Sequence, residues 1–222
     1  MNFQLLVFDW DGTLMDSAAR IVASLTAAFE DVGAEPPAPE RCRDIIGLGM
    51  EEAVFALWPE STTAQRGEFI HRYRHHYLVA NGTPTPLFNR AEAVISSLHD
   101  AGYLLAVATG KSRRGLDAAL EESGLGRWFH ATRTAEETFS KPHPKMLSEL
   151  MDELGVGADD SLMIGDTEYD LQMAANAGVG AVAVSCGAHE AHRLLAMQPL
   201  GCLSGIDALP DWLARQATPP PR

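Results

Sequence analysis

Basic residues are scarce in this sequence: its 222 residues include 17 Lys and Arg against 30 Asp and Glu, which gives a formal net charge of −13. Proteins that bind nucleic acid need clustered positive charge to neutralise phosphates, so no nucleic-acid partner is expected. No apolar run is long enough to cross a bilayer. The first residues also lack the basic opening of a signal peptide. We therefore expect a cytoplasmic protein with no membrane partner.

Cysteine is also rare. The three cysteines, Cys42, Cys186 and Cys202, are odd in number and widely spaced, which favours reduced thiols over a disulfide framework or a zinc site. Apolar residues make up 46% of the chain and charged residues 21%, proportions typical of a globular protein. The length allows one large domain, or a medium domain with a smaller insert, as a monomer or a homodimer.

Short apolar runs alternate with helical patterns after residue 88. Together with a first run at 4–8, the runs that end in polar residues predict strands near 103–109, 161–166 and 179–185. Helical spacing predicts helices near 90–101, 113–122, 144–154 and 168–177. This alternation indicates an α/β fold in which a parallel sheet is doubly wound, with helices on both faces.

Between the first predicted strand and residue 88 the sequence is typical of helices and loops. An unstructured connection of that length is uncommon inside a compact domain. We therefore predict an α-helical unit at residues 16–87, inserted into a core of residues 1–15 and 88–222. Its hinges are expected near Met15–Asp16 and Pro84–Phe88.

The first motif that suggests chemistry is DWDGTL at residues 9–14, directly after the first predicted strand. Two carboxylates two residues apart, Asp9 and Asp11, can face one cleft when the chain turns at Gly12. One can then act as nucleophile or metal ligand while the other exchanges protons. An Asp-Gly pair also marks hairpin turns. The residues that follow are helical rather than a partner strand, so we favour the chemical role.

Two further candidates, taken singly, have simple structural explanations. Thr109 and Gly110 end a predicted strand, where a hydroxyl and helix N–H groups can cradle an anion. A threonine or serine there can also merely cap the helix. The neighbouring Lys111 suggests a P-loop, but the G-x-x-x-x-G-K pattern is absent. Lys141 precedes Pro142, and an isolated lysine of this kind is usually a solvated surface charge.

Asp166 and Asp170 follow another predicted strand. Thr167 and Asp170 match a helix capping box, which does not exclude Asp166 as a cation ligand. Asp9, Thr109 and Asp166 all lie at carboxyl ends of predicted parallel strands, the edge where open α/β sheets bind ligands. Carboxylates, a hydroxyl and a lysine suit a Mg²⁺-assisted reaction on phosphate. The metal would supply the positive charge that an acidic chain lacks.

In order and spacing these motifs resemble the haloacid dehalogenase-like hydrolase superfamily: D-x-D-G-T-L, a Thr at a strand end, Lys-Pro, then G-D-x-x-x-D. The resemblance covers nearly the whole chain, and FDWDGTLMDS with GDTEYDLQMAANAG looks most like the phosphoglycolate phosphatase branch. It implies a Rossmann-like core, an α-helical cap at the insert, and Mg²⁺-dependent phosphomonoester hydrolysis through an aspartyl-phosphate. True dehalogenases of the superfamily lack the second aspartate, so Asp11 favours phosphate over halide chemistry.

The resemblance also implies roles for individual residues. Asp9 would be the nucleophile and Asp11 the general acid and base. Thr109, Gly110 and Lys141 would bind the substrate phosphate. Mg²⁺ would be held by Asp9, the backbone carbonyl of Asp11, and Asp166, with Asp170 in support.

Other activities fit part of the pattern. A phosphomutase or an inorganic pyrophosphatase on the same scaffold would share all four motifs. A metal-dependent glycosyltransferase could use the Asp9-x-Asp11 pair, but it would not explain Lys141 or Asp166. A non-catalytic binding protein would not need both Asp9 and Asp11.

The insert is expected to choose the leaving group. Its loop Gly47-Leu48-Gly49 could approach a ligand closely, because glycine has no side chain to clash. Arg43 and the basic residues Arg72, Arg74 and His75 offer positive charge. A guanidinium can bind a carboxylate bidentately, so 2-phosphoglycolate is the leading candidate substrate. These arginines can equally be solvated charges on helix faces.

Overall fold

Six parallel strands form one central sheet in the computed structural model, which describes residues 3–216. Their spatial order is β3-β2-β1-β4-β5-β6, so the direction of winding reverses at β1. In open α/β sheets, ligands bind outside the carboxyl ends of the strands at such a reversal. The strands are β1 (Leu5–Phe8), β2 (Leu104–Thr109), β3 (Ala131–Thr134), β4 (Ser161–Gly165), β5 (Gly180–Val184) and β6 (Gly201–Leu203).

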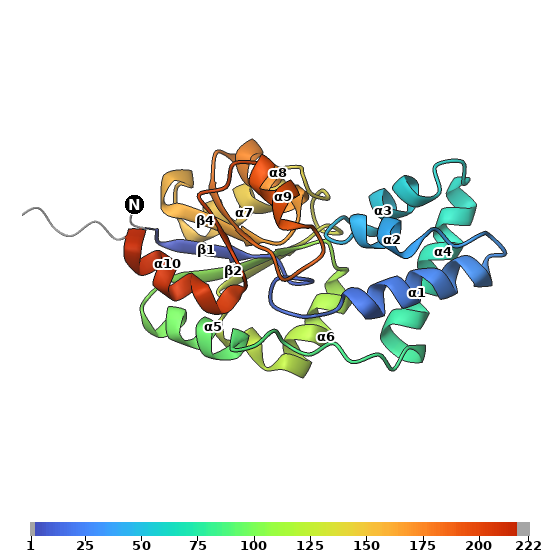
Figure 1. The fold of residues 1–222 in the computed structure, drawn as a ribbon, viewed down its shortest axis with the longest axis horizontal. Helices are drawn as coiled ribbons and strands as arrows, with labels where there is room; N and C mark the ends of the chain where they lie inside the picture. The colour runs from blue at the N-terminus through green and yellow to red at the C-terminus, as the bar shows by residue number, and fades with distance from the viewer. Residues whose placement is uncertain (1–2, 217–222) are drawn as a thin grey trace, which may run out of the picture.

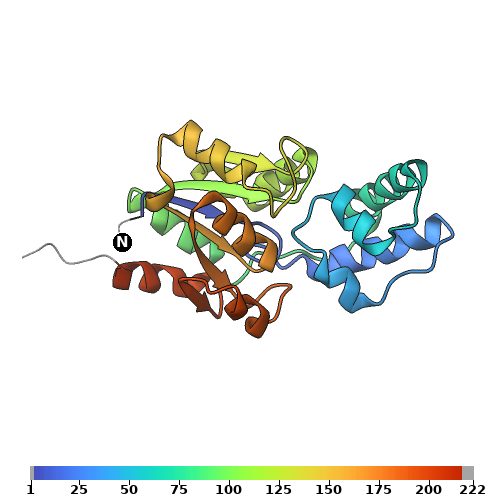
Figure 2. The ribbon, with the colours of Figure 1, turned by 90° about the horizontal axis from the view of Figure 1, so that it is seen from above.

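Helices cover both faces of this sheet (Figures 1 and 2). Successive side chains of a strand point to opposite faces, so Leu6 and Phe8 pack in one hydrophobic core while Leu5 and Val7 pack in the other. The first core is covered by α5 (Ala91–Asp100), α6 (Arg113–Ser123) and α10 (Leu209–Gln216). The second is covered by α7 (Lys145–Leu154), α8 (Glu168–Ala177) and α9 (Ala191–Ala196).

The ends of these helices follow local sequence signals. Three of them, α6, α7 and α8, end at glycines with positive φ, Gly124, Gly155 and Gly178, because a left-handed residue there costs glycine nothing. At the start of α8, Thr167 and Asp170 form the expected capping box. Short helical turns complete the core: η2 (Leu125–Trp128), η3 (Ala158–Asp160) and η4 (Ile206–Ala208).

The chain between β1 and α5 forms a separate group of helices, set at one end of the sheet in both views (Figures 1 and 2). These helices enclose a hydrophobic cluster of their own, in which the rings of Phe29 and Phe69 lie 4.6 Å apart. The group, called the helical unit below, contains α1 (Ala18–Asp31), α2 (Pro39–Asp44), α3 (Met50–Leu57), α4 (Thr63–His75) and the π-helical turn η1 (His76–Ala80).

The two connections between the helical unit and the sheet run side by side. Met15 and Leu87 form an antiparallel bridge, and the backbone N–H of Phe88 donates to the carbonyl of Leu14 at 2.9 Å. These contacts lie at the two segments where the sequence predicts hinges.

The predicted fold class is confirmed: the chain is α/β, with a doubly wound parallel sheet and helices inserted after the first strand. The four strands predicted from apolar runs all occur. Two strands were missed: β3 (Ala131–Thr134) is mostly polar, and β6 (Gly201–Leu203) is only three residues long. Within residues 3–216, no helix has the length and apolar composition needed to span a bilayer.

Candidate active site

The loop after β1 brings two acidic side chains to the switch point of the sheet. Asp9 follows the last residue of β1 and is completely buried, whereas Asp11 is 8% exposed. Gly12 makes the turn between them and the next helix with φ at +84°, which favours glycine. A Cβ at Gly12 would also lie 2.1 Å from Oδ2 of Asp166. The glycine thus allows the loops after β1 and β4 to meet.

Three buried carboxylates gather where these loops meet. Oxygen atoms of Asp9, Asp166 and Asp170 all lie within 4.8 Å of one another. Asp166 accepts hydrogen bonds from the Thr13 hydroxyl at 2.8 Å and from the backbone N–H of Ala188 at 2.7 Å. These donors fix the direction of its carboxylate. Figures 1 and 2 show that the segments involved, from the two halves of the chain, lie side by side in the core.

Lys141 is the positive charge of this cluster. Its ammonium lies 2.6 Å from Oδ1 of Asp9 and 2.7 Å from Oδ1 of Asp170. The side chain of Lys141 is completely buried, unlike the solvated lysine that its position before Pro142 would suggest in isolation. The capping box accounts for the other oxygen of Asp170, which accepts from the Thr167 hydroxyl at 2.7 Å. Asp170 therefore both caps α8 and pairs with Lys141.

Burial raises the pKa values of two carboxylic acids in this cluster, and the positive charge of Lys141 opposes the rise. Burial raises the pKa of Asp9 well above its usual value, although Lys141 opposes the shift. Burial, followed by the charge of Asp170, raises the pKa of Asp166 to about 7. Oδ2 of Asp9 has no hydrogen-bond partner within residues 3–216. Buried carboxylate oxygens that lack a donor are the ligands that Mg²⁺ prefers, so the cluster fits a divalent cation of this kind.

The side chain of Asp11 points away from the cluster. One of its oxygens accepts a hydrogen bond from the Ser17 hydroxyl at 2.5 Å and lies 2.8 Å from the ammonium of Lys111. Ser17 stands at the N-cap position of α1, but its side chain makes no capping bond and instead holds Asp11. The carboxylate of Asp11 lines a cavity on the side of the helical unit. The sequence motifs assign the backbone carbonyl of Asp11, and not its side chain, to the metal, so the direction of the side chain does not conflict with that prediction.

Thr109 ends β2 beside this loop and is 1% exposed. The helix that follows is capped by Ser112, whose hydroxyl accepts from the N–H of Gly115, so capping does not explain Thr109. The Thr109 hydroxyl accepts from the backbone N–H of Lys111 at 3.3 Å. A Cβ at Gly110 would lie 2.3 Å from the carbonyl oxygen of Leu48. The loop at residues 47–49 of the helical unit therefore lies directly against this glycine.

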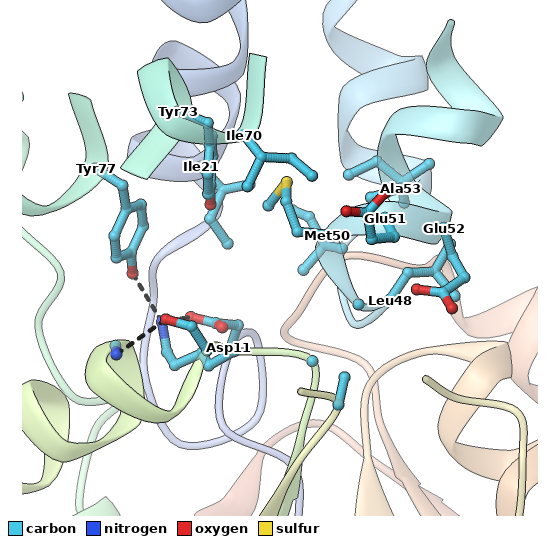
Figure 3. Close-up of a pocket in the computed structure, with 18 of the residues that line it drawn as sticks. Asp11, Ile21, Leu48, Met50, Glu51, Glu52, Ala53, Ile70, Tyr73 and Tyr77 are labelled. Atoms are coloured by element: carbon cyan, nitrogen blue, oxygen red, sulfur yellow. Dashed lines mark hydrogen bonds and ion pairs between the residues drawn. The ribbon is translucent and has the colours of Figure 1, made fainter. Parts of the chain in front are cut away.

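A cavity of about 490 Å³ separates the core from the helical unit (Figure 3). Asp11 and Lys111 lie on its core side, and Lys111 donates to the Tyr77 hydroxyl of the helical unit at 2.9 Å. Figure 3 shows Tyr73 and Met50 across the cavity from Asp11. The loop at residues 47–49 closes one side.

The structure separates the basic residues that the sequence suggested for substrate choice. Arg43 is exposed on α2 and is not among the residues that line the cavity. Arg72 is exposed and pairs with Glu68 within α4. Arg74 does line the cavity and pairs with Glu136 of the core.

Sequence reasoning missed Lys111, Tyr73 and Tyr77 as cavity residues. Lys111 was considered only as a P-loop lysine, yet its ammonium pairs with Asp11. The tyrosines belong to the run FIHRYRHHYLV, and their spacing of four residues places both on one side of a helix. That spacing was the available signal.

Buried carboxylates, a lysine and a threonine at the switch point of a doubly wound sheet, beside an inserted helical unit, define a class of α/β hydrolases. Residues 6–184 match the haloacid dehalogenase-like hydrolase family, and the chain belongs to that family. The resemblance found in the sequence motifs is thereby confirmed, and with it the assignment as a phosphatase.

Similar proteins cover almost the whole chain. The protein named "Probable phosphatase IndB" of Dickeya dadantii is 34% identical over 201 residues, which is 88% of this chain and 86% of that protein. The "Phosphoglycolate phosphatase" of Mesorhizobium japonicum is 32% identical over 225 residues, or 97% of each chain. A crystal structure of a haloacid dehalogenase-like hydrolase from Bacteroides fragilis has a TM-score of 0.87 at 25% identity, covering 94% of this chain and 100% of the other.

Proposed function

We propose that this phosphatase hydrolyses phosphomonoesters of small metabolites through an aspartyl-phosphate on Asp9, with Mg²⁺ as cofactor. The observation that carries the proposal is the environment of Asp9. Its carboxylate is buried next to Lys141, belongs to a cluster with Asp166 and Asp170, and has one oxygen without a hydrogen-bond donor. An ionised oxygen in such a place can attack phosphorus without a separate base.

The residues present support a Mg²⁺ site. We assign the ion to Asp9, Asp166 and the backbone carbonyl of Asp11, with Asp170 holding Lys141 beside it. When bound, Mg²⁺ would neutralise negative charge on the phosphoryl group and keep both carboxylates ionised.

Asp11 is the proposed proton carrier. In the first step an oxygen of Asp9 forms a bond to phosphorus, and the bond to the leaving alcohol breaks. The carboxyl group of Asp11 gives its proton to that alcohol. In the second step a water attacks the aspartyl-phosphate, Asp11 takes a proton from it, and phosphate is released with Asp9 restored. The position of Asp11 on the wall of the cavity supports this role, because the leaving group must lie on that side.

Thr109, Gly110 and Lys141 are proposed to bind the phosphoryl oxygens. The Thr109 hydroxyl lies at the end of β2, and the ammonium of Lys141 already contacts Asp9. Backbone N–H groups after a strand end are suitable donors to an anion. Lys141 also neutralises charge that would otherwise repel a phosphate from the acidic cluster.

We further propose that residues 16–87 act as a cap over a core of residues 1–15 and 88–222. The close contact of the loop at residues 47–49 with Gly110, and the paired connections at Met15 and Leu87, support a closing movement. Closure would exclude bulk water while the phosphoryl group is transferred to Asp9.

For the substrate, 2-phosphoglycolate is the candidate from the sequence, and several relatives carry the name phosphoglycolate phosphatase. Arg43 is one of the basic residues that the sequence offers for its carboxylate, but the exposed position of Arg43 on α2 gives it little support. We keep 2-phosphoglycolate as the reference substrate. The proposal places the enzyme in the cytoplasm, as a monomer or a homodimer.

The test is release of inorganic phosphate from a panel of phosphorylated metabolites, including 2-phosphoglycolate, with and without Mg²⁺. Metal-dependent release that is lost in Asp9→Asn is the expected result. A phosphomutase would instead return the phosphoryl group to a second hydroxyl, and a pyrophosphatase would act on pyrophosphate alone. No release from any monoester, or equal release in a chelator, would overturn the proposal.

A further inference from the structure

The cavity next to Asp11 is too large to be explained by the phosphoryl group. Its volume is about 490 Å³, within the range of roughly 300–1,000 Å³ that holds drug-sized ligands. Asp11, the proposed proton donor to the leaving alcohol, lies on its wall. If the proposed function is right, on which this inference rests, the leaving group occupies this space.

The wall that the helical unit contributes is mainly hydrophobic. Its apolar and aromatic members come from α1, the loop after α2, α3, α4 and η1 (Figure 3). They include Ile21, Leu48, Met50, Ile70, Tyr73 and Tyr77. A surface of this kind gains free energy by removing apolar surface of a ligand from water. It gains none from a short, charged acid.

The positive charges on the cavity wall are already paired. Lys111 contacts Asp11 and Tyr77, and Arg74 pairs with Glu136. Within residues 3–216, Lys111 and Arg74 are the two basic residues that line the cavity. A carboxylate on the leaving group would therefore compete with carboxylates of the protein for these two positive charges.

The remaining charges on the wall are negative. Glu51 and Glu52 line the cavity near the start of α3, and neither has an ion pair or a hydrogen bond within residues 3–216 (Figure 3). Carboxylates on the wall disfavour an anionic leaving group by repulsion. The pairing of the cations and the negative charge of the two glutamates thus both disfavour binding of the glycolate carboxylate in this cavity.

We propose that this cavity selects an uncharged, mainly apolar leaving alcohol that is larger than glycolate. The phosphoryl group is recognised by the core, and the alcohol by the apolar wall of the helical unit. The reaction that supplies the substrate must accordingly phosphorylate, or release in phosphorylated form, a neutral alcohol of that kind.

Linear alkyl phosphates test the proposal directly. Ethyl, butyl and hexyl phosphate are primary alcohol esters of nearly equal chemical reactivity, so their rates differ through contacts with the cavity. We expect kcat/KM to rise about fourfold for each added methylene that is buried, as transfer of apolar surface predicts. Hexyl phosphate should also exceed 2-phosphoglycolate. Equal kcat/KM along the series, or a preference for 2-phosphoglycolate, would overturn the proposal.

A failure of the proposed substrate class can be distinguished from a failure of the proposed phosphatase function. p-Nitrophenyl phosphate has a good leaving group and reports the phosphatase chemistry with little help from the cavity. If it is hydrolysed but the alkyl series is flat, the proposed function stands and the substrate class is wrong. If no ester is hydrolysed, both fail.

Met50 offers matched variants, because its side chain is half-buried and points into the cavity (Figure 3). Met50→Gln keeps the size but adds a polar amide, and it should lower the hexyl-to-ethyl ratio of kcat/KM about tenfold. Met50→Leu should retain most of the ratio, because it remains apolar. Val79, which is 70% exposed on η1 and does not line the cavity, supplies the control Val79→Gln with an unchanged ratio. An equal ratio in Met50→Gln and Met50→Leu would remove the apolar wall from substrate selection.

Discussion

The ammonium of Lys141 lies 2.6 Å from Oδ1 of Asp9, and both side chains are shielded from solvent. The same ammonium lies 2.7 Å from Oδ1 of Asp170. Two carboxylates thus share one lysine, so the positive charge remains paired when either acid changes. A substitution of Asp9 can therefore remove its chemical role without leaving the ammonium of Lys141 unpaired.

Asp9→Asn is expected to abolish phosphate release while leaving the fold intact. The amide has the shape of the carboxylate but cannot form an aspartyl-phosphate, and Lys141 keeps its pair with Asp170. Phosphate release and thermal melting of the purified variant are the measurements. Beryllofluoride, which mimics a phosphorylated aspartate, should inhibit the wild type. Substantial turnover in pure Asp9→Asn protein would exclude Asp9 as the nucleophile.

Lys141→Met is expected to destabilise the protein. Removing one partner of a buried ion pair leaves uncompensated charge and typically costs about 3–5 kcal/mol in the free energy of unfolding. The loss should shrink at acidic pH, because burial raises the pKa of Asp9, which can then take up a proton. Urea denaturation in a chelator measures it. Arg72→Met is the control, because its pair with Glu68 is about half exposed and should contribute at most about 1 kcal/mol. Equal destabilisation by the two variants would contradict this.

The sequence was sufficient to predict four of the six described strands. It also predicted the positions of Asp9, Thr109 and Asp166, because the ends of parallel strands lie at one edge of the sheet. It could not predict that Lys141 is buried. That outcome depends on Asp9 and Asp170, which are distant in the chain, and a lysine before proline carries no local signal of its partners. The short strand β3 was missed for a similar reason: Ala131–Thr134 pairs through its backbone, with few apolar side chains to reveal it.

The cavity was the least predictable feature. The charge of Arg43 makes it a candidate for substrate binding, but the structure leaves Arg43 exposed on α2. Ser17 fits an N-cap pattern, but its hydroxyl donates to Asp11. Which face of a helix meets the core is decided by packing between helices, and α4 has a weakly patterned sequence in which Phe69 and Ile70 are its buried residues. Such a sequence leaves the orientation of Tyr73 and Tyr77 open.

Mg²⁺ should stabilise the folded protein more at alkaline than at acidic pH. Without metal, the pKa of Asp166 is raised by burial from 3.8 to about 7. Because the pKa of Asp166 is raised, its contribution to the free energy of unfolding is fully present below the pKa of this carboxyl in the unfolded chain. The contribution is lost as the pH rises through about 7. Mg²⁺ binds the ionised carboxylates and should reverse this loss, by about 2.7 kcal/mol at 100 times its Kd.

Thermal melts with and without Mg²⁺, at about pH 5.5 and about pH 8, check this expectation. Asp166→Asn should remove most of the Mg²⁺-dependent increase in Tm and flatten its dependence on pH. An increase in Tm that is equal at both pH values, or that survives in Asp166→Asn, would exclude Asp166 as a ligand.

Asp11→Asn should lower kcat by about 10²–10⁴-fold, the usual contribution of a general acid or base. The amide keeps the shape of the carboxylate beside Ser17, and Lys111 keeps its hydrogen bond to Tyr77, but the ammonium loses its anionic partner, so thermal melting is measured alongside turnover. The loss in the first step should be smaller for p-nitrophenyl phosphate, whose leaving group needs no proton. Single-turnover measurements with this ester and with ethyl phosphate separate the steps. The same loss with both esters would contradict the proton transfer to the alcohol.

Gly110→Ala should impair catalysis by keeping the helical unit from closing. A Cβ at this position would lie 2.3 Å from the carbonyl oxygen of Leu48 and 2.6 Å from that of Gly47. Both are backbone atoms, so the whole loop must retreat. The same loop is anchored by the N–H of Gly49, which donates to the Ser140 hydroxyl at 2.7 Å. A displacement of about 1 Å near a reacting centre can reduce the rate about 10²-fold, and we expect a loss of that order in kcat/KM.

Gly67→Ala is the matched control for this variant. Gly67 belongs to α4 of the same helical unit, and a Cβ there would meet no atom within 4 Å. Alanine in a helix should stabilise the fold by about 0.5–1 kcal/mol and leave kcat/KM unchanged. If closure is what Gly110 permits, Gly110→Ala should also lose the preference for hexyl over ethyl phosphate, because an open cavity no longer removes the alkyl chain from water. Wild-type kcat/KM in Gly110→Ala would show that contact between the loop at residues 47–49 and the core is not required for turnover.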